Sequence, residues 1–232
     1  MARARALDAA RQARTDLYRR LILDAAERCF ARAGYDPTKI QDIAQEAGLS
    51  VGSLYGVFPG KRELHAALQE ERGAELLERA REATAREATP LEVLLAGIGV
   101  YIEFFVAHPD YLRMQVRHGI AWALGPSPEA HEQSEQYAAW RQGFELATQI
   151  FRDAIDAGQV IDEDPELLAK MMIAMHQVHL ADWLEHGMKL SASELVERVH
   201  RHFRRTFVAP EKARRQGAVR ARAARPHRPA TR

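Results

Sequence analysis

The stretch from Ile43 to Lys61, IAQEAGLSVGSLYGVFPGK, contains two signals that end a helix. Gly48 tolerates the positive φ at which helices commonly stop, and Pro59-Gly60 cannot continue a helix. Ser50, a favoured N-cap residue, lies between the two signals. The stretch therefore predicts two short helices that meet at a tight turn, which restricts the fold to a few helical corner motifs.

A steep crossing of two short helices needs a small residue where the backbones approach, and Ala44 meets that requirement. The pair must also turn apolar side chains toward a supporting helix. Such side chains occur at the expected inward positions Ile43, Ala47, Leu49, Leu54 and Val57. Together these features predict a helix-turn-helix motif over residues 39–58.

The outward face of the second short helix carries side chains small or polar enough to enter a DNA major groove. Thr38 and Lys39 precede the first short helix, and Lys61 begins the helix after Pro59-Gly60, where free N–H groups favour a phosphate. The predicted DNA-binding residues are Thr38, Lys39, Ser50, Val51, Gly52, Ser53, Tyr55, Gly56 and Lys61.

The rest of the chain predicts an all-α fold. Ala, Leu, Glu and Arg dominate its 232 residues, and 47% of them are hydrophobic, enough for a real core. Start and stop signals predict a first helix from Thr15 to Gly34 and a second that Thr38 caps. Further helices are predicted from Lys61 to about Glu87, after Thr89-Pro90, after Pro109, from Ser127-Pro128 to about Ala157, after Asp164-Pro165 and after Ser191 or Ser193.

Charge is distributed unevenly along the chain. Residues 1–65 carry 11 Lys and Arg against 8 Asp and Glu, residues 66–208 carry 14 against 23, and residues 209–232 carry 8 against 1. Basic ends suit contacts with a polyanion. We predict a basic, flexible arm (1–14), a DNA-binding domain (15–75), an effector-binding and dimerisation domain (76–208) and a basic disordered tail (209–232). An alternative for residues 1–14 is that they extend the first helix.

Residues from about Asp16 to Gln69 resemble the N-terminal domain of the TetR family of transcriptional regulators. The resemblance lies in FARAGYDPTKIQDIAQEAGLS followed by VGSLYGVFPGKRELHAAL. It implies a homodimer with a three-helix head on a larger helical bundle, whose recognition helices enter successive major grooves of a palindromic operator. It also implies a small molecule that binds the bundle and releases DNA. Gly56 departs from the family, which usually has a larger side chain there.

Aromatic side chains and methionines concentrate in the middle of the chain, where a cavity between helices would suit a hydrophobic or aromatic effector. The same side chains could simply fill a bundle core. Four polar groups within the apolar stretches could orient a ligand: Glu103, His118, His176 and His179. The candidate effector-binding residues are Tyr101, Glu103, Phe105, His118, Trp122, Tyr137, Trp140, Phe144, Met175 and His179.

Metal and catalytic chemistry lack a full signature. The single cysteine, Cys29, excludes a cysteine-built zinc site. His176, His179 and His186 share a helical face but lack a complete ligand set, so we expect no metal or cofactor. No nucleophile motif, phosphate loop or paired Glu-x-x-His arrangement is present, so we expect no enzyme.

The apolar run LEVLLAGIGVYIEFFVA is interrupted by Glu92 and Glu103, so we expect no membrane span, and the N-terminus lacks the apolar region of a secretory signal. We expect a cytoplasmic, nucleoid-associated protein. The predicted function is that of a repressor that a small effector releases from a palindromic operator. The alternative is a DNA-binding regulator or activator without an effector.

Overall fold

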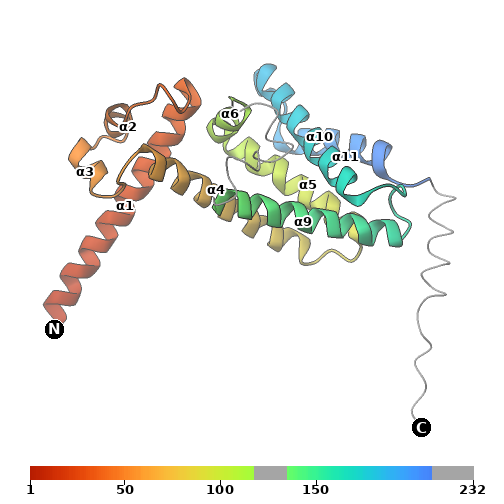
Figure 1. Ribbon diagram of the computed structural model, residues 1–232, viewed down its shortest axis with the longest axis horizontal. Coiled ribbons are helices and arrows are strands. Elements are labelled where there is room, and N and C mark those ends of the chain that lie inside the picture. Colours follow the sequence, from red (N-terminus) through yellow and green to blue (C-terminus); the bar gives the residue numbers. More distant parts are fainter. Residues whose placement is uncertain (118–134, 211–232) are drawn as a thin grey trace, which may run out of the picture. The chain divides into compact units, whose positions relative to one another are not determined.

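The computed structural model describes residues 1–117 and 135–210, and helices make up most of them (Figure 1). The prediction of an all-α fold is confirmed. The helices in these residues are α1 (Ala2–Ala33), α2 (Ile40–Glu46), α3 (Val51–Tyr55), α4 (Lys61–Thr84), α5 (Pro90–Ala107), α6 (Pro109–Arg117), α9 (Glu135–Asp156), α10 (Pro165–Glu185) and α11 (Ala192–Phe207).

The helices divide into two compact units. Unit 1 comprises Met1–Glu75 and the segment that begins at His108, and unit 2 comprises the segment Leu76–Ala107 and the later helices. Helix α4 contributes its first part to unit 1 and its last part to unit 2. Helix α6 packs against α1 and so lies in unit 1, although its residues fall in the 76–208 segment of the sequence. The predicted tail beyond Pro210 lies outside the described residues.

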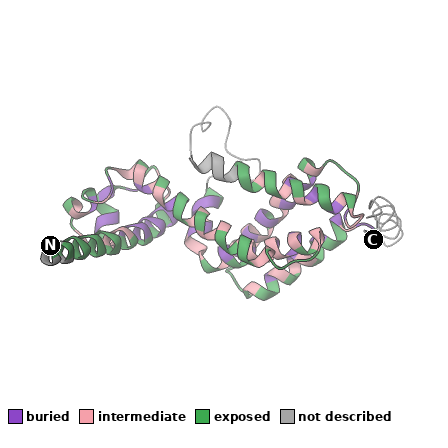
Figure 2. Cartoon of the chain, turned by 90° about the horizontal axis from the view of Figure 1, so that it is seen from below, coloured by how far each residue is buried: buried purple, intermediate pink, exposed green. Residues whose placement is uncertain are grey.

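Unit 1 is built around the second half of α1. Ile22, Ala26 and Phe30 of α1 are fully buried, as are Leu54 of α3 and Leu64 of α4. The first half of α1 extends away from the other helices of the unit (Figure 1), and Figure 2 shows it as exposed. The first helix does not start at Thr15, and the alternative that residues 1–14 extend it is the one that holds. The helix continues through the arginine-rich N-terminus, and the Thr15 hydroxyl donates to the Arg11 carbonyl within it.

Unit 2 is a bundle around α5, which contacts α9, α10 and α11. Among the described residues, α5 is the one helix long and apolar enough to cross a membrane by length and composition, which is weak support for a span. Its buried side chains, among them Ile98, Ile102 and Phe104, pack inside the bundle. Packing against three helices accounts for the apolar composition that the sequence shows here.

The last helix of the bundle is fixed at both ends. Ser191 caps α11, because its hydroxyl accepts from the Glu194 N–H. At the other end, the Ile161 N–H donates to the Phe207 carbonyl and the Ala209 N–H donates to the Gln159 carbonyl. These bonds hold the segment between α9 and α10 against the end of α11.

Candidate nucleic-acid interface

Helices α2 and α3 meet at the corner that the sequence predicts. Gly48 has φ 69°, a value that favours glycine, and its N–H donates to the Gln45 carbonyl. The Leu49 N–H donates to the Ala44 carbonyl at 2.9 Å. The positive φ of Gly48 redirects the chain in a few residues, so that α3 begins soon after α2 ends.

The supporting helix for this corner is α1. Ile43 and Ala44 of α2 are buried, and Leu54 of α3 is fully buried. At the surface, Arg28 of α1 donates to Glu46 of α2 at 2.8 Å, and this bond is the main cause that lowers the pKa of Glu46. The predicted inward positions Ala47, Leu49 and Val57 are half-buried.

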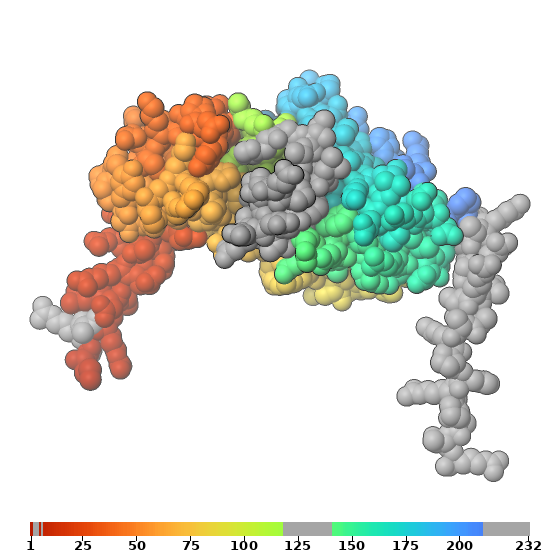
Figure 3. All heavy atoms as spheres, in the orientation of Figure 1, coloured from red at the N-terminus to blue at the C-terminus, as the bar shows by residue number. Residues whose placement is uncertain are grey.

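Helix α3 presents a short, uncrowded surface. The Ser50 hydroxyl caps it by accepting from the Ser53 N–H at 3.0 Å, which confirms Ser50 as the N-cap. Gly52, Tyr55 and Gly56 are exposed, Tyr55 to 51%, and Val51 and Ser53 are half-buried. The atoms of α2 and α3, drawn in orange tones, form part of the surface of unit 1 (Figure 3).

This helix is shorter than the stop signal at Pro59-Gly60 would allow. Helix α3 ends at Tyr55, and Gly56 follows as its C-cap. The N–H groups of both Val57 and Phe58 donate to the Leu54 carbonyl, which closes the chain into a turn, and the Phe58 ring is buried. The α3 helix and its two caps are therefore limited to residues 50–56.

The two residues that precede α2 have different roles. The Thr38 side chain is buried, and its hydroxyl donates to the Gly34 carbonyl at 2.6 Å. The prediction of Thr38 as the N-cap is wrong, because Lys39 is the N-cap and its N–H donates to the Asp42 carboxylate at 3.1 Å. Lys39 is exposed at the surface, whereas the Thr38 hydroxyl is turned into unit 1.

Lys61 stabilises a turn in this structure. Its ammonium donates to the carbonyls of Tyr35, Asp36 and Thr38 at 2.9, 3.0 and 3.0 Å, and lies 4.4 Å from the centroid of the Tyr35 ring. An ammonium has three N–H donors, and three carbonyls already accept them. A phosphate contact at Lys61 would have to compete with these bonds.

The arginines near the N-terminus lie on the exposed, helical first half of α1. The sequence also raises the hypothesis that an N-terminal arm reaches a DNA minor groove through Arg3, Arg5, Arg11 and Arg14. The helical backbone of α1 does not suit such an arm. A helix about 10–12 Å wide exceeds a minor groove about 6 Å wide.

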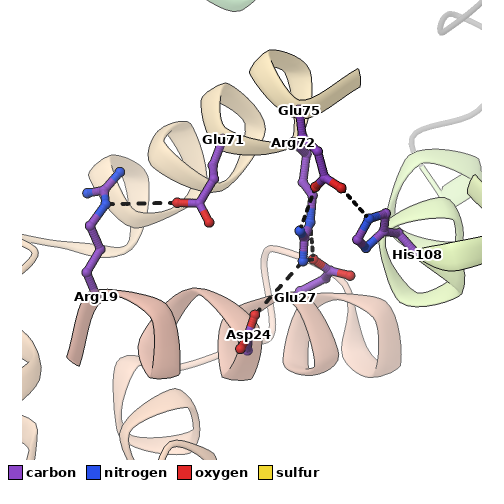
Figure 4. Close-up of polar contacts among 7 residues, drawn as sticks. All are labelled: Arg19, Asp24, Glu27, Glu71, Arg72, Glu75 and His108. Carbon is purple, nitrogen blue, oxygen red and sulfur yellow. Dashed lines mark hydrogen bonds and ion pairs between the residues drawn. The ribbon is translucent and has the colours of Figure 1, made fainter. Parts of the chain in front are cut away.

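A polar cluster links α1, α4 and the start of α6 within unit 1 (Figure 4). Arg72 of α4 contacts Glu27 and Asp24 of α1 and Glu75 of its own helix, and Glu75 in turn contacts His108 at 3.2 Å. The sequence does not predict this cluster. Glu27 and Arg72 are 45 positions apart, so helical spacing gave no signal for their contact.

A buried network lies beside this cluster. The Tyr111 hydroxyl of α6 and the Gln115 amide both donate to the Gln69 carbonyl oxygen of α4, at 2.7 and 2.9 Å. Burial is the main cause that raises the pKa of Tyr111. These bonds satisfy three buried polar side chains and fix α6 against α4 inside unit 1.

The predicted effector residues are dispersed. Phe105 is buried, and its ring lies 4.9 Å from that of half-buried Tyr101. Exposed Glu103 lines a groove of about 690 Å³ between α4 and α5, together with Arg79, Glu82 and Arg86. The charged lining does not match the hydrophobic cavity that the sequence predicts.

The remaining predicted effector residues do not form one site in the described structure. Half-buried Phe144 lies under the Lys170 ammonium, and Met175 is half-buried. His179 Nε2 lies 2.9 Å from His202 Nδ1. His118 and Trp122 lie outside the described residues, as do the side chains of Tyr137 and Trp140.

The histidine face of α10 does not converge. His176 is 4% exposed, whereas the side chain of His186 is 72% exposed and contacts Asp182. No group of three or more His, Cys, Asp or Glu in the described ranges could hold a metal ion.

The segment that contains the α2–α3 corner matches a known protein family. Residues 22–68 match the family model described as bacterial regulatory proteins, tetR family. The A-factor receptor protein of Streptomyces griseus is 26% identical over 168 residues, which are 71% of this chain and 54% of that protein. The uncharacterized HTH-type transcriptional regulator YuxN of Bacillus subtilis is 28% identical over 100 residues, 43% of this chain and 34% of YuxN. The chain thus spans about a third to a half of these two curated relatives.

Solved structures share the fold. The ketosteroid transcriptional regulator KstR2 of Mycobacterium tuberculosis has a TM-score of 0.71 and 23% identity, over 83% of this chain and 95% of that one. The transcriptional regulator FadR of Bacillus subtilis, in complex with stearoyl-CoA, has a TM-score of 0.62 and 20% identity, over 77% of this chain and 94% of the FadR chain. At these identities the likeness shows the fold alone.

Proposed function

We propose that this chain, whose residues 22–68 match the family model of bacterial regulatory proteins of the tetR family, is a transcriptional regulator of the repressor type. In this proposal it binds a palindromic operator as a homodimer and leaves it when a small hydrophobic or aromatic effector binds. The observation that carries the proposal is the α2–turn–α3 corner, whose outer surface is uncrowded at Gly52, Tyr55 and Gly56.

We propose the DNA contacts from the side chains of the corner that are exposed to solvent. Tyr55 offers a hydroxyl and a ring to the groove, and Ser50 and Ser53 offer hydroxyls at the start of α3. Gly52 and Gly56 allow the α3 backbone to approach the bases. Lys39 provides a phosphate contact before α2, while Thr38 and Lys61 act indirectly by holding the turn that precedes α2.

The proposed homodimer has a candidate surface on α10. Leu167, Met171 and Val178 are 45%, 41% and 67% exposed, and their spacing places them on one face of the helix. An apolar stripe of this kind favours burial against a partner. A second copy of the same stripe, related by a two-fold axis, would cover it.

The dimer can be tested by charge insertion. We expect Val178→Glu to shift the protein toward the monomer in sedimentation velocity and to weaken operator binding. In a symmetric dimer, the new carboxylates of the two copies would be buried close to each other at the two-fold axis. Leu146→Glu, at an exposed position of α9, is the matched control. An unchanged dimer in Val178→Glu would reject α10 as the interface.

The effector part of the proposal draws on the relatives only by analogy. KstR2 is described as a ketosteroid regulator, and the FadR structure contains stearoyl-CoA. The aromatic and methionine content of unit 2 suits ligands with large apolar bodies. We propose a cytoplasmic protein that acts on nucleoid DNA, and the matched family is one of regulators rather than enzymes.

The alternative, a regulator or activator without an effector, predicts different behaviour in the cell. Expression of the genes beside the bound sites should rise when the gene for this protein is deleted if the protein represses, and fall if it activates. A compound that raises the melting temperature and also weakens operator binding would support an effector-gated regulator. Operator binding that no stabilising compound weakens would support the alternative.

A further inference from the structure

Two successive side chains of α10 contain buried nitrogen atoms without a hydrogen-bond partner. They are Nε2 of His176 and Nε2 of Gln177, and the two residues are 4% and 9% exposed. The other buried polar side chains of the described residues make hydrogen bonds: Glu27, Thr38, Gln69, Gln115 and Thr148. The two unpartnered atoms therefore stand apart from the rest of the described interior.

An unpaired polar atom in a protein interior costs folding free energy, because water is removed and nothing replaces its hydrogen bond. Apolar side chains of similar size at these positions would avoid that cost. An unsatisfied group in a native structure therefore requires a reason, and one reason is a partner that arrives later.

The surroundings of His176 are aromatic. The His176 ring lies 5.2 Å from the Tyr101 ring of α5, and the Tyr101 ring lies 4.9 Å from the Phe105 ring. The titratable groups that act on His176 are His179 of its own helix and His200 of α11. His200 Nε2 is itself placed 2.9 Å from the Leu95 carbonyl.

The interior around His176 contains no charged side chain among the described residues of unit 2. In the described part of unit 2, the buried polar side chains are Thr148, His176 and Gln177, and no Lys, Arg, Asp or Glu is among them. Burial also lowers the pKa of His176 to about 3, so this imidazole is neutral near pH 7. A carboxylate or phosphate would find no buried cation among these described residues.

The chemistry of the two atoms defines what they can bind. The Gln177 amide nitrogen can only donate, so its partner must be an acceptor such as an oxygen. The neutral imidazole can donate or accept at Nε2, according to its tautomer. An oxygen of a ketone, ester or alcohol can meet either requirement.

We infer that His176 and Gln177 are the polar contacts of the effector site, and that the effector is an uncharged apolar molecule with a carbonyl or hydroxyl oxygen. The inference rests on the proposed function for the consequence of binding. The binding site itself rests on the two unpartnered atoms and the aromatic rings beside them.

The first test compares one substitution at two buried glutamines. Met resembles Gln in length, so Gln177→Met should raise the melting temperature of the ligand-free protein by removing an unpaired polar atom. Gln115→Met is the matched control and should lower it, because the Gln115 amide donates to Gln69 at 2.9 Å. A loss in Gln177→Met as large as that in Gln115→Met would overturn the inference.

The second test uses three probes of equal chain length with the purified full chain: methyl nonyl ketone, undecanoic acid and undecylamine. We expect the ketone to bind most tightly by calorimetry. Its dissociation constant should rise about tenfold in His176→Leu and in Gln177→Met, as expected for a lost buried hydrogen bond. Equal or tighter binding of the acid or amine, no binding of the ketone, or ketone binding unchanged in both variants would overturn the inference.

Failure of the proposed function gives a different result. If the ketone binds as expected and the variants weaken it, but operator binding does not respond to the ketone, the site stands and effector-controlled release is rejected. If the ligand-free variants bind the operator like the wild type, His176 and Gln177 affect DNA binding only through the ligand, as the inference requires. Loss of operator binding in the ligand-free variants would overturn that role.

Discussion

Arg72 of α4 donates from both Nε and Nη2 to the same carboxylate oxygen of Glu27 on α1, at 2.8 and 2.7 Å. The side chains are 15% and 9% exposed, so this ion pair is largely removed from water. It joins the helix that supports the α2–α3 corner to α4, which follows that corner in the chain (Figure 4). The geometry of the unit that contains the α2–α3 corner therefore depends on a pair distant in sequence.

Removing one member of this pair should destabilise the protein strongly. Arg72→Met leaves the Glu27 carboxylate buried without its main partner, and we expect a loss of about 3–5 kcal/mol in urea unfolding. The double variant Glu27→Leu with Arg72→Met should recover most of that loss. Arg62→Met removes an exposed pair with Glu63 and should change stability by less than about 1 kcal/mol. Similar losses for Arg72→Met and Arg62→Met would contradict this account.

Substitutions of Lys61 and Lys39 should show which lysine stabilises the fold and which one binds a DNA phosphate. Lys61→Met removes three bonds from an ammonium to backbone carbonyls, so we expect a stability loss of about 2 kcal/mol or more, with an unchanged salt dependence of DNA binding. Lys39→Met should leave stability nearly unchanged and reduce the slope of log K against log salt by about 0.9, as one lost phosphate contact does. The measurements are urea unfolding and fluorescence anisotropy at several salt concentrations. The reverse pattern would show that Lys61 binds phosphate.

Gly52 tests whether α3 needs a close backbone approach to DNA. A Cβ at Gly52 would lie 3.8 Å from Ser50 Oγ, an ordinary contact, so Gly52→Ala should be tolerated or stabilising by up to about 1 kcal/mol. Its operator affinity should nevertheless fall, because the added methyl group lies on the surface proposed to face the bases. Gly73→Ala in α4 meets nothing within 4 Å and should stabilise the protein without an effect on affinity. Equal affinities for the two variants would argue against close approach at Gly52.

Acid should destabilise the protein through the buried His176 and the half-buried His179 and His200. Burial lowers the folded-state pKa of His176 to about 3, below the unfolded value near 6.5, and burial also lowers the pKa of His179 and His200. Between these values the unfolded state binds more protons, so stability is full above about pH 6.5 and falls as the pH drops below it. For His176 the loss approaches about 1.4 kcal/mol per pH unit.

The measurement is urea unfolding at several pH values from 7.5 to 5, with wild type, His176→Leu and the exposed-site control His186→Leu. We expect a smaller loss on acidification in His176→Leu than in the other two proteins. Parallel stability curves for all three proteins would show that His176 does not cause the acid sensitivity.

Local signals predicted the corner correctly because its determinants are local. The positive φ of Gly48 and the cap at Ser50 depend on a few neighbouring residues, and both are confirmed. Their positions at the starts of helices suggest surface roles for Thr38 and Lys61. Their hydroxyl and ammonium groups instead bind carbonyls elsewhere in unit 1, which spacing along one helix does not reveal.

The start of α1 and the effector site are also features that local sequence signals do not predict. Thr15 is a good N-cap by type, but helix-favouring Ala and Arg residues continue α1 back to Ala2. In unit 2, aromatic composition pointed to many candidate residues, while the unpartnered atoms lie on His176 and Gln177. Whether a buried polar group has a partner is a property of tertiary packing, so composition cannot report it.

Selection of bound sequences from a random pool of double-stranded DNA, with the purified full chain, tests the central claim most directly. The account predicts enrichment of a palindrome whose half-sites are separated by about one helical turn, as two symmetry-related recognition helices require. Tyr55→Ala, which alters an exposed α3 side chain, should weaken binding to that palindrome. Enrichment of no sequence, or of a site without two-fold symmetry, would contradict a homodimer that reads DNA through α3.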